Sequence, residues 1–339
     1  MTYTERLYRN TTVRIGIAML SFLGFFWLLS NGALSLVLVV TDFLPETAGT
    51  LIYELSSAIF YAAAFTLPVF VFRLLPAQAP LQPMRLELTA PRETPLYLFF
   101  GVAVVSAAAY LNSIMISFFE YAEFADEYLW QTPTYTGNYQ MVLMFFSLAI
   151  VPAFVEEFLF RGMVLSNLLP YGQSTAIVGS ALLFGLMHQN LQQIFYTTVA
   201  GLVLGWVYVR TQSIWPCVLL HLFNNFQSVL QTAVIERLPE ATADVVLNWM
   251  EGGIFLLGAV SGVLLLLSER DRFAAVRKRG VFGQEPQPEA YVPHLLSVRS
   301  RIKHFFNAPM IIFVVLCILT MLLYALIAAL MPMILGGAP

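Results

Sequence analysis

Several ionisable or amide side chains that could take part in chemistry fall inside stretches of sequence that are otherwise strongly apolar. They are Glu156, Glu157, Arg161, His188, His221 and Asn225. A charged side chain at bilayer depth costs about 2.5 kcal/mol or more, so such residues usually face a bundle interior and take part in chemistry or binding. A carboxyl group, two imidazoles and an amide are the groups that a hydrolase needs to activate water and stabilise an oxyanion.

The two adjacent glutamates are expected to have different roles. Residues four apart share one face of a helix, whereas adjacent residues diverge by about 100°. Glu157 is therefore expected to pair with Arg161 as structural support, with the acid preceding the base. Glu156 is left without a partner on its own helix, which makes it the candidate general base. His221 and Asn225 are also four apart and present an imidazole and an amide on one face.

Three short motifs contain these residues in order. Glu-Glu-x-x-x-Arg begins at Glu156, Phe-x-x-x-His ends at His188, and His-x-x-x-Asn runs from His221 to Asn225. Together, and within hydrophobic segments, they resemble the motifs of the CAAX-protease and bacteriocin-processing family (CPBP, or Abi) of intramembrane endopeptidases. The resemblance covers residues 139–235. It implies an enzyme that cuts peptide bonds in or near the membrane, in a family often catalogued with metalloproteases.

The resemblance also implies site roles and partners. Glu156 and His188 would activate a water molecule, while His221 and Asn225 would stabilise the oxyanion. Eukaryotic relatives cut prenylated CAAX proteins, whereas many prokaryotic relatives are linked to bacteriocin immunity or peptide processing. The expected partners are membrane lipid and a protein or peptide substrate, lipidated or not. The chain contains neither the Gly-x-Ser-x-Gly nor the His-Glu-x-x-His motif of other hydrolases.

The sequence leaves two mechanisms open with respect to metal. Glu156, His188 and His221 would supply one oxygen and two nitrogens, which is an acceptable zinc set with water in the fourth position. The two histidines, however, lack a short chelating spacing, and Asn225 is a poor zinc ligand but a good oxyanion donor. We therefore favour a mechanism without a metal or other cofactor and keep zinc as the alternative.

Two other classes of function fit the same polar residues. A proton-coupled transporter could relay protons through Glu156, His188 and His221, but no symmetric pair of broken helices is visible in the sequence. A non-catalytic immunity or scaffold protein would bind a peptide in the same cavity without cutting it. Measurement of peptide cleavage by the purified protein distinguishes such a binding protein from a peptidase.

The composition identifies the environment of these residues as a membrane. Of the 339 residues, 59% are hydrophobic and 11% are charged, whereas a soluble domain has about a quarter of its residues charged. A soluble protein is therefore excluded. The net charge of −3 gives no basic excess for nucleic-acid binding. The two cysteines, Cys217 and Cys317, lie in apolar stretches and are expected to be packing residues.

The hydrophobic stretches predict an all-α, polytopic bundle of about nine transmembrane helices. The expected spans are 15–41, 52–73, 95–119, 139–167, 174–188, 192–210, 214–235, 252–268 and 310–335. We divide the chain into N-terminal helices (1–138), a catalytic core (139–235) and C-terminal helices (236–339). The C-terminal part includes a polar, proline-containing loop, 269–309.

The charged residues between the spans predict the orientation of the chain. Arginines are concentrated in three segments, 6–14, 73–92 and 270–279, and acidic residues in the alternating segments 42–46, 120–127 and 236–251. The positive-inside rule places the arginine-rich segments, including the N-terminus and loop 269–309, in the cytoplasm. An odd number of spans then places the C-terminus outside. We expect an integral, multi-pass protein of the plasma membrane.

Overall fold

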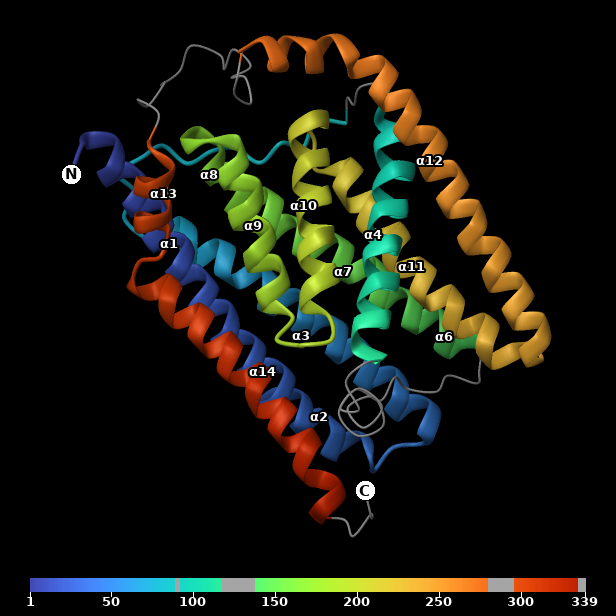
Figure 1. Cartoon of the computed structure of the whole chain (residues 1–339). Coiled ribbons are helices and arrows are strands. Elements are labelled where there is room, and N and C mark those ends of the chain that lie inside the picture. Colours follow the sequence, from blue (N-terminus) through green and yellow to red (C-terminus); the bar gives the residue numbers. More distant parts are fainter. Residues whose placement is uncertain (89–91, 118–137, 280–295, 335–339) are drawn as a thin grey trace.

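The computed structural model describes residues 1–88, 92–117, 138–279 and 296–334, and this part of the chain contains helices and no strands (Figure 1). The predicted all-α class is confirmed. The helical segments are α1 (Tyr3–Phe26), η1 (Trp27–Ala33), α2 (Leu34–Thr41), α3 (Glu46–Leu74), α4 (Thr94–Ser117), α6 (Asn138–Met144), η2 (Phe145–Ile150), α7 (Val151–Glu157), η3 (Phe158–Leu165), α8 (Ser166–Leu168), η4 (Leu169–Tyr171), α9 (Gln173–Met187), α10 (Ile194–Thr211), α11 (Trp215–Arg237), α12 (Glu240–Arg279), α13 (Val298–Phe305) and α14 (Ala308–Ile334).

The helices agree with a bundle of about nine spans. Seven helical stretches in the described part of the chain are long and apolar enough to cross a membrane. The other two predicted spans correspond to α9, which has 15 residues, and to α11, which carries His221 and Asn225. The expected breaks on either side of α9 are present, with positive φ angles of 133° at Gly172 and 49° at Gln189.

The predicted eighth span, 252–268, is too short. Helix α12 runs for 40 residues, Glu240–Arg279, because glutamate, alanine and arginine continue the helix beyond the apolar run. The predicted loop 269–309 is correspondingly too long. Its beginning belongs to α12 and part of its end to α13, while residues 280–295 lie outside the described part. The division into segments 1–138, 139–235 and 236–339 stays a prediction.

Helices α1 and α14 lie side by side and run in the same direction (Figure 1). The start of α14 meets α1 at Gly16, where an added Cβ would lie only 2.8 Å from Met310 N. In the nine-span prediction, α1 belongs to the first span and α14 to the ninth. All odd-numbered spans of one chain cross a membrane in the same direction. The parallel arrangement therefore agrees with nine spans, and the choice of sides stays a prediction.

We expect reporters at the N-terminus and near Lys278 to be cytoplasmic and a reporter after Pro339 to be external, because arginines flank the first two positions. Alkaline phosphatase and green fluorescent protein fusions at the three positions measure this. A C-terminal reporter on the same side as Lys278 would contradict nine spans.

Close helix packing brings α10 to the core of the bundle. At Gly201 of α10 an added Cβ would lie 2.8 Å from Ala181 Cα of α9. Small residues at such contacts let two helix backbones touch, which is the usual way that membrane helices pack closely. The same stretch of α10 presents the Gly201 carbonyl oxygen to Arg161 of η3, at 3.1 Å. The glycine therefore serves both packing and the polar network.

Candidate active site

Glu156 and Glu157 end α7, between two π-helical segments, η2 and η3. Such widened turns occur often at functional sites. Pro152 has no N–H to donate to the carbonyl oxygen of Leu148 one turn earlier. That oxygen instead accepts a hydrogen bond from Asn225 Nδ2 of α11, at 3.1 Å. The proline therefore frees a backbone acceptor that fixes Asn225.

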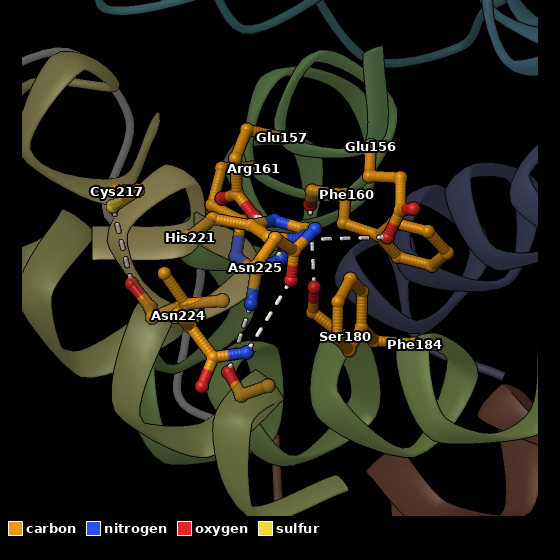
Figure 2. A network of polar contacts seen from close by, with 12 residues as sticks. Glu156, Glu157, Phe160, Arg161, Ser180, Phe184, Cys217, His221, Asn224 and Asn225 are labelled. Atoms are coloured by element: carbon orange, nitrogen blue, oxygen red, sulfur yellow. Dashed lines mark hydrogen bonds and ion pairs between the residues drawn. The ribbon is translucent and has the colours of Figure 1, made fainter. Parts of the chain in front are cut away.

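Glu157 is the centre of a buried polar network (Figure 2). Its Oε1 accepts hydrogen bonds from Arg161 NH1 and from His221 Nδ1, each at 2.9 Å. The guanidinium of Arg161 also lies over the ring of Phe184, 4.8 Å from its centroid. Both charged side chains of the ion pair have 0% exposure. The pair expected from the helical spacing is present, whereas the contact with His221 was not predicted.

The network determines which atom of His221 faces Glu156. A carboxylate paired with arginine only accepts hydrogen bonds, so His221 Nδ1 must be the donor to Glu157. The other ring nitrogen, Nε2, lies 4.0 Å from Glu156 Oε2. Glu156 Oε2 is buried and has no hydrogen-bond partner among the described residues. A water molecule beside this pair, rather than between its two atoms, would be within hydrogen-bonding distance of both.

The second oxygen of Glu156 is held by Tyr61 of α3, a residue that the sequence did not single out. The Tyr61 hydroxyl donates to Glu156 Oε1 at 2.5 Å. The ring of Tyr61 packs against Phe65 and Phe26, with centroid distances of 4.6 and 6.4 Å. This aromatic packing fixes the hydroxyl, and the hydroxyl fixes the carboxylate. No short motif could reveal Tyr61, because the contact joins residues far apart in the chain.

His188 is positioned by its own motif. Its Nδ1 lies 2.8 Å from the carbonyl oxygen of Phe184, one turn earlier on α9. A carbonyl oxygen only accepts, so Nδ1 carries the proton and the Nε2 of a neutral imidazole is available as an acceptor. The Phe184 ring packs edge-on against both His188 and His221, with centroid distances of 5.2 and 5.9 Å. The phenylalanine therefore supports both histidines.

All four predicted catalytic side chains line one cavity of about 60 Å³, namely Glu156, His188, His221 and Asn225. A water molecule needs only about 10–15 Å³ of such space, so the cavity can hold several. Asn224 and Tyr196 also line it. Asn224 donates to Oδ1 of its neighbour Asn225 at 3.3 Å. The cavity thus combines a carboxylate, two imidazoles and two amides.

The proposed zinc ligands do not converge on one point. Glu156, His188 and His221 have suitable donor atoms, but no three His, Cys, Asp or Glu side chains in the described residues form a group that could hold a metal ion. The residues as placed do not fit a zinc ion, and no catalytic step is assigned to one.

Comparison with known proteins agrees with the motifs. Residues 138–227 match the family model described as "Type II CAAX prenyl endopeptidase Rce1-like", and this range contains all three motifs. The chain is 27% identical over 118 residues to "Putative membrane peptidase YdiL" of Bacillus subtilis (strain 168). That match covers 34% of this chain and 47% of the relative, so the chain spans about half of the relative's length. No solved structure matches the chain. The resemblance to the CPBP family is confirmed for this segment.

Proposed function

We propose that the protein is an intramembrane endopeptidase that hydrolyses peptide bonds of membrane-associated substrates. The observation that carries the proposal is the buried carboxylate of Glu156, which has one oxygen held by Tyr61 and the other 4.0 Å from His221 Nε2, beside a cavity of about 60 Å³. A buried carboxylate oxygen without a partner is costly unless it serves a purpose. The family match over the same residues supports proteolysis.

In the proposed reaction, Glu156 removes a proton from a cavity water while the water oxygen attacks the peptide carbonyl carbon. The acceptor nitrogen of His188 orients the same water. The tetrahedral intermediate then collapses, the carbon–nitrogen bond breaks, and Glu156 returns the proton to the leaving amine. The products are a carboxylic acid, which keeps the second proton of the water until it ionises, and an amine. Tyr61 keeps the carboxylate in a fixed position throughout.

The oxyanion is proposed to be stabilised from α11. Asn225 uses one N–H to bind the Leu148 carbonyl, and its amide group has a second N–H to offer. His221 can donate from Nε2 only when both ring nitrogens are protonated. The pair is thus suited to hold negative charge that develops on the carbonyl oxygen.

The substrate is proposed to be a protein or peptide at the membrane, as in CAAX-type or bacteriocin-type processing, with or without a lipid. We place the protein in the plasma membrane with a cytoplasmic N-terminus. The test is turnover by the purified chain, together with profiling of peptides from membranes that contain wild type or Glu156→Ala. New peptide ends that need Glu156 support a peptidase. Binding of the same peptides without cleavage would favour a scaffold or immunity protein, and proton-driven uptake into vesicles would favour a transporter.

We expect Tyr61→Phe to lower kcat about 10- to 100-fold with little change in KM, because a hydrogen bond to a charged group contributes about 1.5–3 kcal/mol. Tyr53→Phe, earlier on the same helix, is the matched control. A wild-type kcat in Tyr61→Phe would show that Tyr61 serves packing alone.

We expect activity to survive prolonged dialysis against a strong chelator, since Glu156, His188 and His221 do not form a metal-binding group. Elemental analysis should find much less than one zinc per chain. Stoichiometric zinc, with activity lost on chelation and restored by added metal, would replace the proposed mechanism with a zinc-dependent one.

A further inference from the structure

A second cleft continues from the catalytic cavity and lies between α4, α11 and α12. Its volume is about 330 Å³, and it shares Tyr196, Asn224 and Asn225 with the first cavity. The three helices contact one another, and α4 and α11 end on the side of the bundle where α12 begins (Figure 1). The two spaces therefore adjoin at these shared side chains, which places the cleft beside the cavity that contains Glu156.

The walls of this cleft are strongly polar. They include Ser106, Ser113, Gln227, Ser228, Gln231 and Glu251. Ser106 donates to Gln227 Oε1 at 3.2 Å, which joins α4 to α11. In hydrocarbon, each polar group that lacks a partner costs several kcal/mol. A cleft with this lining suits water and a peptide backbone, which offers an N–H and a carbonyl at nearly every residue.

Glu251 is the charged side chain of this lining. It is half-buried on α12, and no hydrogen bond or ion pair to it is found among the described residues. The stretch that follows it in sequence, 252–268, carries no charge. An isolated carboxylate beside amides and hydroxyls attracts a cation with N–H donors, because such a partner removes the cost of its partial desolvation. A lone carboxylate supplies too few ligands for a calcium or magnesium ion, which needs about six.

We propose that this cleft binds the part of the substrate next to the scissile bond, and that Glu251 selects substrates with a lysine, an arginine or a free amino group there. The inference rests on the proposed peptidase function and names its substrate class. The cleft extends from Asn225 to one side of the catalytic cavity. We therefore expect the enzyme to prefer a cationic residue at a single position of the substrate, on one side of the cleavage site.

The test uses the full-length purified protein and peptides in which a single lysine moves along a neutral sequence, with glutamine as the neutral control. Wild type should cut the peptide with lysine at one position about tenfold better in kcat/KM, as expected for a partly buried charge pair. Glu251→Gln should remove this preference, and Glu251→Lys should reverse it toward glutamate. Asp244→Asn, an exposed change on the same helix, should leave it intact. Equal rates for all peptides in wild type and Glu251→Gln would overturn the inference while leaving the peptidase in place.

A binding measurement separates the two proposals. Fluorescent lysine and glutamine peptides are titrated onto Glu156→Gln and onto Glu156→Gln/Glu251→Gln, so that no cleavage is needed. Tighter binding of the lysine peptide that depends on Glu251 supports the inference even if wild type cuts nothing, in which case the peptidase proposal alone fails. Equal binding of both peptides by both proteins overturns the inference.

Discussion

Glu156→Gln is expected to fold and accumulate as wild type does and to lose peptide hydrolysis by about 10²- to 10⁴-fold, the usual contribution of a general base. The substitution keeps an oxygen that can accept the Tyr61 hydrogen bond. It replaces the oxygen that faces His221 with an amide NH₂ group. The glutamine side chain cannot remove a proton from water. The loss should therefore appear in kcat, with KM nearly unchanged. Initial rates on a cleaved peptide and detergent melting curves measure the two effects.

A matched control for this variant is Glu236→Gln, the same chemical change at an exposed position near the end of α11. It should keep wild-type rates. Full activity in Glu156→Gln would rule out the proposed base and move water activation to His188. If Glu156→Gln failed to accumulate, Glu156 would be needed for folding. That result would contradict the expectation that this substitution affects catalysis alone.

The parts of the site that depend on local spacing could be predicted from sequence. Glu157 and Arg161 are four apart on one helix, and the ion pair forms as expected. The spacing Phe184 to His188 likewise produces a hydrogen bond within one turn. Helical periodicity places such residues before any tertiary contact is known. The sequence was also sufficient for the helical class, because charge-free stretches of this length must span a membrane.

The contacts between helices could not be predicted from one sequence. Tyr61 reaches Glu156 from a helix outside the matched segment, and tyrosines are common in membrane helices. The hydrogen bond between Glu157 and His221 likewise joins two helices. Helical spacing predicts Arg161 as the partner of Glu157, whereas the structure shows His221 as a second partner. One signal was present: Pro152 in the fourth span predicts a carbonyl without its helical partner, and Asn225 binds at that place.

The double role of Glu157 gives a prediction about stability and activity together. Glu157→Leu and Arg161→Met, made separately, should each lower the free energy of unfolding by about 3–5 kcal/mol, because each leaves a fully buried charge without its partner. The combined variant should recover most of this stability, since a buried ion pair can be replaced by apolar side chains of similar volume at little cost. Unfolding in one detergent, followed by a packing-sensitive fluorescence signal, measures all three proteins.

Activity should not recover with stability in the combined variant. Leucine at position 157 offers no acceptor for His221 Nδ1, so the imidazole loses the contact that holds it at 2.9 Å and directs Nε2 toward Glu156. We expect kcat to remain at least about tenfold below wild type, the effect of one lost hydrogen bond to a charged group. Glu157→Gln/Arg161→Met is the matched control, because glutamine still accepts from Nδ1, and it should be the more active of the two. Equal, wild-type activity in both combined variants would show that Glu157 acts only as the partner of Arg161.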